Sequence, residues 1–258
     1  MDNKLIKRKA QVAIWVIIAI GIVVIILGLF FLLKENSRIK ISGENNLNPN
    51  SYIEICARNA VKEAVDIMLP QGGFLEPGSF KVYNDNKIEY LCLNTGYYRP
   101  CVNQHPMFLN EMKKEIETYV SPRIDKCFND LKNELEKKQN TVNLGPQGIE
   151  VSFAPSRIFL NIERKMAVNA EDGTQGYQNF KVDIISPLYD LGLVAIEIAG
   201  QEAKYCYFEY VGYMIIYPKF NIEKFAMSDS TKIYTIEDKK TGKKLNIAIR
   251  SCAIPPGI

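Results

Sequence analysis

The sequence predicts an α+β protein in which an N-terminal transmembrane helix precedes an extracytoplasmic domain of helices packed on antiparallel sheet. Three observations favour this fold class. An uncharged apolar run occupies residues 12–33, helical spacing of apolar residues marks the next part of the chain, and strand-like alternation dominates the remainder. About 210 of the 258 residues follow the run and its linker, which is enough chain to bury one or two small cores.

The apolar run from Val12 to Leu33 has the length and composition of a membrane-spanning helix. Its 22 residues contain no charge and, at about 1.5 Å per helical residue, reach about 33 Å, enough to cross a hydrocarbon core. A cleavable secretory signal would have a shorter apolar segment followed by small residues. We therefore expect residues 1–11 to form a cytoplasmic basic segment or leader, residues 12–33 to form the transmembrane helix, and membrane lipid to be a partner.

Charge and cysteine positions predict that the large domain lies outside the cytoplasm. Four cationic residues precede the run and three follow it, a balance that leans towards a cytoplasmic N-terminus. All six cysteines come after the run, an even number typical of a disulfide-containing domain in an oxidising space. The chain after residue 40 holds 25 basic and 27 acidic residues, a net charge of −2, so we expect no nucleic-acid partner.

A polar linker and an amphipathic helix begin the domain. Residues 34–50 are rich in Asn, Ser and Gly, which is typical of a linker. Ser51 and Glu54 have the spacing of a capping box, and charged residues then recur every four positions opposite apolar ones. This pattern predicts a helix that begins at Ser51 and ends near the sequence LPQGG.

A hairpin and a second helix complete the region assigned to residues 51–145. Short alternating runs on either side of the turn sequence NDNK predict the hairpin. From Pro106 onward, apolar residues recur at spacings of three and four, as in an amphipathic helix. Ser121 and Pro122 interrupt this stripe, so we expect a long helix with a bend or a break there.

The C-terminal region, residues 146–258, is predicted to be an α+β region built on sheet. The sequences IEVSFA, RIFLNIER and NFKVDII have strand character and are separated by turn formers, which favours an antiparallel sheet. Ser186 and Pro187 begin a helix, and the tail from Asn221 has the pattern of a strand meander. The segment KYCYFEYVGYMIIY is ambiguous between helix and strand. We expect its aromatic side chains to pack in the core, the alternative being an aromatic binding face.

Six cysteines permit about 15 connectivities, of which one is favoured. Its pairs are Cys92 with Cys101, Cys56 with Cys127, and Cys206 with Cys252. The first pair brackets a short loop at the end of the hairpin, the second joins the apolar faces of the two predicted helices, and the third remains by subtraction. Buried free thiols are the alternative.

The sequence favours no metal site. His105 is the only histidine, and a zinc site could combine it with Cys92, Cys101 and Cys127. Structural zinc sites usually show two closely spaced pairs of ligands, and the spacing between these cysteines does not fit that pattern. A surface or capping histidine is the preferred interpretation, and no metal ligand is assigned.

No set of residues for catalysis emerges either. The chain lacks the common nucleotide-binding loops, the nucleophile elbow and the zinc-protease motif. The carboxylates of Glu171, Asp172 and Glu209 could act in a cleft, but solvated loop charges are the preferred interpretation. We therefore assign no catalytic residue and no cofactor, and expect a protein that is not an enzyme.

One loop is a candidate contact site. Tyr97, Tyr98 and Arg99 lie between Cys92 and Cys101, and tyrosine with arginine is the composition of protein contact hot spots. The preferred interpretation is that the tyrosines pack against the sheet, and contact is the alternative.

The N-terminal sequence KRKAQVAIW resembles the class III signal of archaeal type IV pilin-like proteins. In that family a prepilin peptidase cuts after a small residue, and the helix that remains is used for filament assembly. The resemblance covers about the first 33 residues and implies a processing site between Ala10 and Gln11. Trp15 stands where such pilins commonly carry a glutamate.

The later sequence resembles a group of uncharacterised single-pass surface proteins from small-genome archaea. The similarity lies in YIEICARNAVKEAVDIMLPQGGFLEP, the helix ending in IDKCFNDL, VSFAPSRIFLNIERKMAV and FKVDIISPLYDLGLVAIEIA. It implies one membrane helix, an α+β outer domain, and Cys56 with Cys127 as partners.

Together these features predict a membrane-anchored, single-pass cell-surface protein with a structural, adhesive or pilin-like role. Its expected partners are membrane lipid and, through the N-terminal helix, further copies of itself or other surface proteins. The alternatives are a membrane-tethered extracytoplasmic enzyme and a solute-binding or sensory domain.

Overall fold

The computed structural model describes residues 21, 23, 48–170 and 173–255. The predicted membrane span at residues 12–33, apart from two of its residues, lies outside the described residues, as does the predicted processing site at Ala10 and Gln11. Within the ranges that the structure describes, no helix is long and apolar enough to cross a membrane. The described chain from residue 48 onward belongs to one compact unit.

The first long helix begins before its predicted start. The helices are α2 (Pro49–Met68), η2 (Leu69–Gln71), α3 (Phe108–Glu136), α4 (Leu188–Tyr205) and α5 (Tyr210–Ile216). Asn48, and not Ser51, caps α2, because its side-chain oxygen accepts a hydrogen bond of 3.0 Å from the backbone N–H of Asn50. Pro49 follows at the first helical position, where its missing N–H costs no hydrogen bond.

One sheet is built from strands of both halves of the chain. Its order is β1-β2-β10-β9-β8, with β3 also paired to β2. The strands are β1 (Phe80–Tyr83), β2 (Asn86–Leu93), β3 (Val102–Asn103), β8 (Phe220–Ala226), β9 (Lys232–Asp238) and β10 (Lys244–Arg250). The predicted hairpin at NDNK is confirmed as β1 and β2, and Asn84 and Asp85 both have positive φ as a two-residue hairpin turn requires. The β2–β10 pair is parallel, which the sequence did not indicate.

The other sheet is antiparallel, as predicted. Its centre is a long hairpin of β4 (Thr141–Ala154) and β5 (Arg157–Ala170). The opposite edge of β5 pairs with β6 (Gly173–Tyr177) along one part of its length and with β7 (Phe180–Ile185) along the other.

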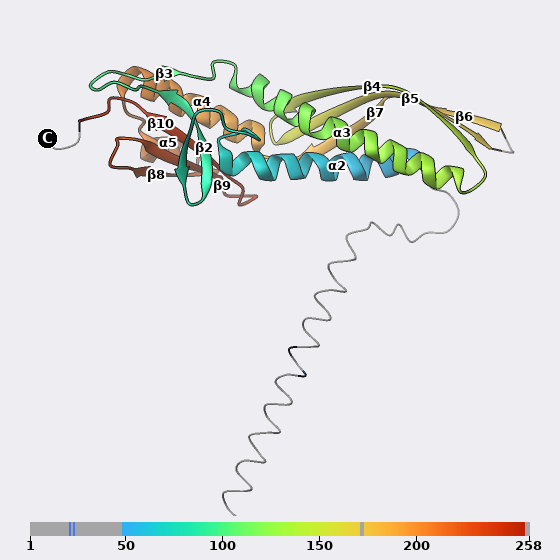
Figure 1. The fold of residues 1–258 in the computed structure, drawn as a ribbon. Coiled ribbons are helices and arrows are strands. Elements are labelled where there is room, and N and C mark those ends of the chain that lie inside the picture. Colours follow the sequence, from blue (N-terminus) through green and yellow to red (C-terminus); the bar gives the residue numbers. More distant parts are fainter. Residues whose placement is uncertain (1–20, 22, 24–47, 171–172, 256–258) are drawn as a thin grey trace, which may run out of the picture. The chain divides into compact units, whose positions relative to one another are not determined.

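Helices α2 and α3 lie side by side and connect the two sheets (Figure 1). They pack on each other, α2 also contacts β7, and α3 also contacts β4. At the other end of α2, η2 contacts β2 and β10, while α4 covers β9 and β10. One continuous apolar core includes residues from all of these elements, so the regions 51–145 and 146–258 share a core.

The predicted long helix is confirmed as α3, which is continuous through Pro122, so of the two predicted outcomes at that position the break is not found. Proline removes the N–H that would bond to the carbonyl four residues earlier. Two side chains donate to neighbouring carbonyls of this turn: Arg123 to that of Tyr119 at 3.0 Å and Gln147 of β4 to that of Ser121 at 3.0 Å. The apolar stripe that packs on α2 and β4 therefore runs along one uninterrupted helix.

The six cysteines form three pairs at disulfide distance, and these are the three favoured from the sequence. Their Cα atoms are 6.3 Å apart for Cys56 and Cys127, 5.4 Å for Cys92 and Cys101, and 5.6 Å for Cys206 and Cys252. The first pair links α2 to α3, the second closes the loop between β2 and β3, and the third joins the end of α4 to the segment after β10. None of the cysteines remains as a free thiol.

Removing the disulfide with the longest loop should destabilise the domain more than removing the disulfide with the shortest. Cys56 and Cys127 are 71 residues apart in sequence, and Cys92 and Cys101 only 9. Chain entropy predicts a loss in the free energy of unfolding of about 4 kcal/mol for the C56A/C127A variant and about 3 kcal/mol for the C92A/C101A variant. Urea unfolding of a fragment of residues 48–258 measures both. A larger loss in the C92A/C101A variant would contradict the expectation.

Candidate functional site

The segment between α4 and β8 is held to the domain at two points. Helix α4 ends at Cys206, which adopts a left-handed backbone conformation with φ 58° and is linked to Cys252. Phe208 is buried, with its ring centroid 5.4 Å from that of Tyr213 and 6.2 Å from that of Tyr234. Together the disulfide and Phe208 fix where α5 begins.

Helix α5 has no fully buried residue. Val211 and Ile215 lie one helical turn apart and are 50% and 77% exposed, and the neighbouring Ile216 is 71% exposed. We name the α5 surface by its exposed members: Tyr205, Tyr207, Val211, Ile215, Ile216 and Tyr217. The expectation that the aromatic side chains of this segment pack in the core was therefore wrong for Tyr205, Tyr207 and Tyr217. Only Phe208 enters the core fully, while Tyr210, Tyr213 and Met214 pack against it in part.

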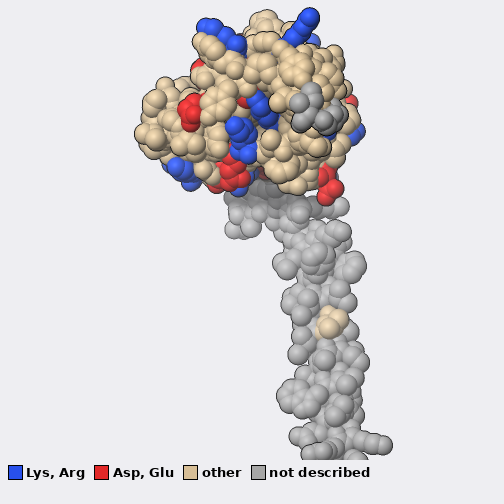
Figure 2. Space-filling view, turned by 90° about the vertical axis from the view of Figure 1, so that its left-hand side faces the viewer, with Lys and Arg blue, Asp and Glu red and all other residues tan. Residues whose placement is uncertain are grey.

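Lysines accompany the exposed tyrosines. The Nζ of Lys224 lies 5.0 Å from the ring centroids of both Tyr207 and Tyr210, and the Nζ of Lys204 lies 4.9 Å from that of Tyr205. Figure 2 looks onto the end of the domain that lies at the left in Figure 1, and this end is mostly uncharged, with basic side chains gathered near its middle. The chemistry of the α5 surface is thus aliphatic and aromatic, with ammonium groups beside it.

Glu209 begins α5 and takes part in local hydrogen bonds. Its carboxylate accepts from the hydroxyl of Tyr207 at 2.6 Å and from the backbone N–H of Gly212 at 3.3 Å. These bonds lower the pKa of Glu209, the bond from Tyr207 most of all. A carboxyl group with a lowered pKa is a poor general acid near neutral pH, which argues against that one role for Glu209. Glu171 and Asp172 lie outside the described residues.

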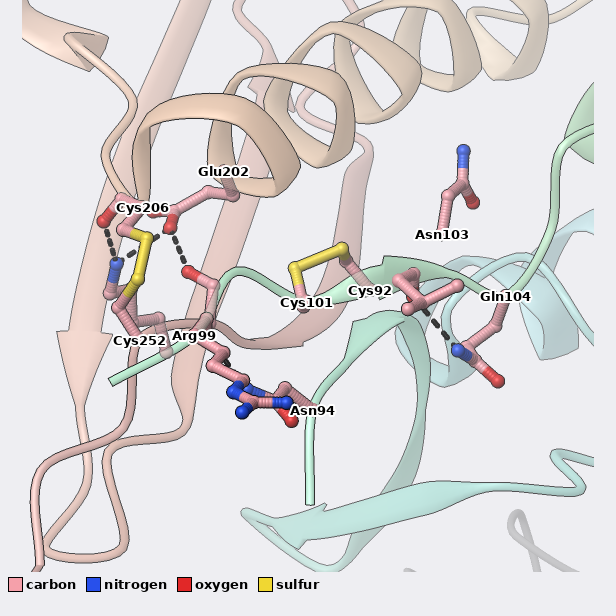
Figure 3. Close-up of a disulfide and its surroundings, with 12 residues drawn as sticks. Cys92, Asn94, Arg99, Cys101, Asn103, Gln104, Glu202, Cys206 and Cys252 are labelled. Atoms are coloured by element: carbon pink, nitrogen blue, oxygen red, sulfur yellow. Dashed lines mark hydrogen bonds and ion pairs between the residues drawn. A yellow bond between two sulfur atoms is a disulfide. The ribbon is translucent and has the colours of Figure 1, made fainter. Parts of the chain in front are cut away.

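A buried carboxylate underlies the start of the α5 segment. Glu202 of α4 is fully buried and accepts hydrogen bonds from Lys232 at 2.6 Å, from the Tyr234 hydroxyl at 2.5 Å and from the Ser251 hydroxyl at 2.5 Å. Burial and the bond to Glu202 raise the pKa of Tyr234, which therefore stays neutral and donates. Lys232 also donates to the carbonyl of Cys206 at 2.7 Å. This network connects α4, β9 and the C-terminal segment beside the Cys206–Cys252 disulfide (Figure 3).

The predicted contact loop is exposed. Tyr97 and Tyr98 are 44% and 64% exposed, and Arg99 is exposed, so neither tyrosine is buried against the sheet as preferred from the sequence. The ring centroid of Tyr97 lies 5.7 Å from the guanidinium carbon of Arg250 on β10. The loop is held at its base, because the carbonyl of Arg99 accepts from the backbone N–H of Cys252 at 2.9 Å and from the side chain of Asn94 at 2.7 Å. Its disulfide and the Cys206–Cys252 disulfide lie in the same part of the structure (Figure 3). The contact role of these residues remains a prediction.

His105 is not a zinc ligand together with the cysteines, because Cys92, Cys101 and Cys127 are in disulfides. Its Nδ1 lies 2.5 Å from the carboxylate of Glu111 on α3 and its Nε2 lies 3.3 Å from that of Glu89 on β2. The ring centroid lies 4.5 Å from that of Phe74. Among the described residues, no group of three or more His, Cys, Asp or Glu side chains is arranged to hold a metal ion.

Two carboxylates decide the protonation of His105. Burial by itself lowers the pKa of the imidazole, but the hydrogen bonds to Glu89 and Glu111 outweigh it and raise the pKa above the ordinary value. Glu89 is almost completely buried and reaches the histidine past Gly72, where an added Cβ would come within 2.8 Å of the Cβ of Glu89. The histidine therefore links β2 to the start of α3 through two carboxylates that favour its protonated form.

Comparison of this chain with protein-family models, with curated proteins and with solved structures found no match. The functional interpretation therefore depends on the chain's own residues.

Loss of the charge on Glu202 should destabilise the domain strongly. The E202Q variant keeps the size of the side chain but leaves the ammonium of Lys232 without its buried partner, which costs about 3 kcal/mol in the free energy of unfolding. Urea unfolding of the 48–258 fragment measures this loss. The E197Q variant, at an exposed position of the same helix, is the matched control and should stay within about 0.5 kcal/mol of wild type. Equal effects of the two substitutions would contradict the role of the network.

His105 should stabilise the domain in acid. The pKa of His105 is higher in the folded state than in the unfolded state, where it is about 6.5. Its contribution to the free energy of unfolding is therefore fully present below pH 6.5 and is lost as the pH rises through the pKa of the folded state. The stability difference between wild type and the H105Q variant should therefore be largest near pH 5.5 and shrink by pH 8.5. NMR titration of the single imidazole tests the cause directly. A folded-state pKa at or below 6.5 would contradict it.

Proposed function

We propose that this chain is a membrane-anchored cell-surface protein that displays a disulfide-linked α+β domain for structural or adhesive contacts. The observation that carries the proposal is the pairing of all six cysteines in the part of the chain that follows the apolar run. Disulfides persist in oxidising spaces outside the cytoplasm. The apolar run supplies the anchor, and its basic N-terminal flank favours a cytoplasmic N-terminus.

Contact, and not catalysis, is the role that the described residues support. Glu209 is held by local hydrogen bonds, and His105 is enclosed by two carboxylates and a phenylalanine ring. The α5 surface instead exposes several large apolar side chains close together in sequence. Contiguous exposed apolar residues with charged groups at their border are typical of interaction sites.

A pilin-like use of the N-terminal helix belongs to the same proposal. Removal of residues 1–10 would leave the apolar run at the N-terminus, and the run would then be available for assembly with other copies. The support for this mode is the resemblance of KRKAQVAIW to the class III signal. Intact-mass measurement of the chain from its native membrane tests it, since a mass that includes residues 1–10 would exclude processing.

Full-length protein should behave as a single-pass membrane protein with its domain outside. The full chain and a variant that lacks residues 12–33 are produced in bacterial cells, and their membranes are extracted with alkaline carbonate. The full chain should stay in the membrane pellet, and the variant should be released. Protease added to intact spheroplasts should degrade the domain, and a maleimide reagent should label it only after reduction. Release of the full chain by carbonate, or protection of the domain in spheroplasts, would contradict the proposal. A cytoplasmic marker protein that stays intact is the control for sealed membranes.

A further inference from the structure

We propose that the α5 surface docks on the lipid bilayer that anchors the chain, so that the domain contacts its own membrane through a second site. The proposal rests on the membrane anchoring proposed above and names a partner for the α5 surface.

The side chains of the α5 surface match the layers of a bilayer interface. Ile215 and Ile216 are its most exposed members, and aliphatic side chains of this kind enter the boundary between headgroups and acyl chains. Tyr205, Tyr207 and Tyr217 each combine an apolar ring with a polar hydroxyl, the property that enriches tyrosine at membrane interfaces. The surface therefore offers an apolar centre with amphipathic side chains next to it.

Two lysines lie at the border of this surface. Lys204 and Lys224 lie over tyrosine rings, where a long side chain can keep its stem on apolar surface and its ammonium at headgroup level. Lys219 lies just after α5 and forms an ion pair with Asp190. The nearby acidic side chains are Asp190, Glu197, Glu209 and Glu223, so the lysines act as single headgroup contacts and not as a net positive field.

The α5 surface is held in place and is not exposed through loose packing of its base. The Cys206–Cys252 disulfide, buried Phe208 and the Glu202 network hold the segment that enters α5, and the backbone N–H of Ile222 points to the sulfur of Met214 at 3.1 Å. A rigid site loses little conformational entropy when it binds.

The linker, when extended, is longer than α2. Residues 34–47 separate the apolar run from the cap of α2, and 14 residues extend to at most about 50 Å. Helix α2 has 20 residues and is therefore about 30 Å long, and its far end reaches the sheet on which α5 packs. The linker thus exceeds the length of the helix that separates the tether from the sheet beside α5.

Tryptophan fluorescence in vesicles with brominated acyl chains tests the proposal on the full chain. Trp15, inside the apolar run, is the only tryptophan, so its quenching in the wild-type protein reports the anchor alone. In a W15F background, I215W reports the α5 surface. I185W is the matched control, because Ile185 is 71% exposed and is separated from the α5 segment by α4, an 18-residue helix about 27 Å long.

In vesicles of phosphatidylcholine and phosphatidylglycerol, we expect bromine to quench the I215W variant at least threefold more than the I185W variant. Adding the K204E/K224E exchange to the I215W variant should reduce that quenching by half or more. Replacing the vesicles with vesicles that lack phosphatidylglycerol should have the same effect on the I215W variant. A V211W variant repeats the measurement if I215W does not keep the far-UV circular dichroism of its parent.

Three results would overturn the proposal. One is solvent-like emission from I215W without quenching. Another is blue-shifted emission without quenching, which would mean that a protein surface, such as a second copy, covers α5. The third is quenching of I215W and I185W to the same degree. Failure of the anchor is seen separately, as unquenched Trp15 in the wild-type protein.

Discussion

The apolar contact between α2 and α3 is the interaction on which the rest of the domain depends. Each helix packs on the other with one face and on the β4–β7 sheet with another, and η2, which continues α2, reaches the sheet with β10. The Cys56–Cys127 disulfide crosslinks this helix pair. Because Val120 and Ile124 on either side of Pro122 are both fully buried, a break in α3 would open the core from which both sheets are organised.

The end of the domain that carries α5 is stabilised by additional covalent and polar contacts. The sheet at this end is the one built from both halves of the chain. Its strands and their neighbours carry two disulfides, the Glu202 network and the contacts of His105 with Glu89 and Glu111. Polar groups buried at this end are satisfied by specific partners, which add directed bonds to its apolar core. Helix α5 contributes no fully buried residue to that core, and its apolar side chains are available for a partner.

Much of the fold follows from local patterns. Alternation and turn residues predicted the hairpins correctly, and the spacing of apolar residues predicted α2, α3 and α4. The errors have physical causes. Asn48 replaced Ser51 as the cap because a capping side chain and a following proline act together. Pro122 lies inside α3 without breaking it, in a turn that Gln147 contacts from β4, and no local pattern contains that contact.

The segment at α5 shows the limit of such reasoning most clearly. A run of tyrosines, isoleucines and valine has the composition of a core element, and composition alone does not show whether another layer covers it. The sequence by itself determined the apolar run, the basic N-terminus, the helices and strands with strong periodicity, and an even set of cysteines. Only the tertiary structure decided that β2 pairs in parallel with β10, that Glu202 receives three donors and that α5 faces outward, because each depends on segments far apart in the chain meeting in space.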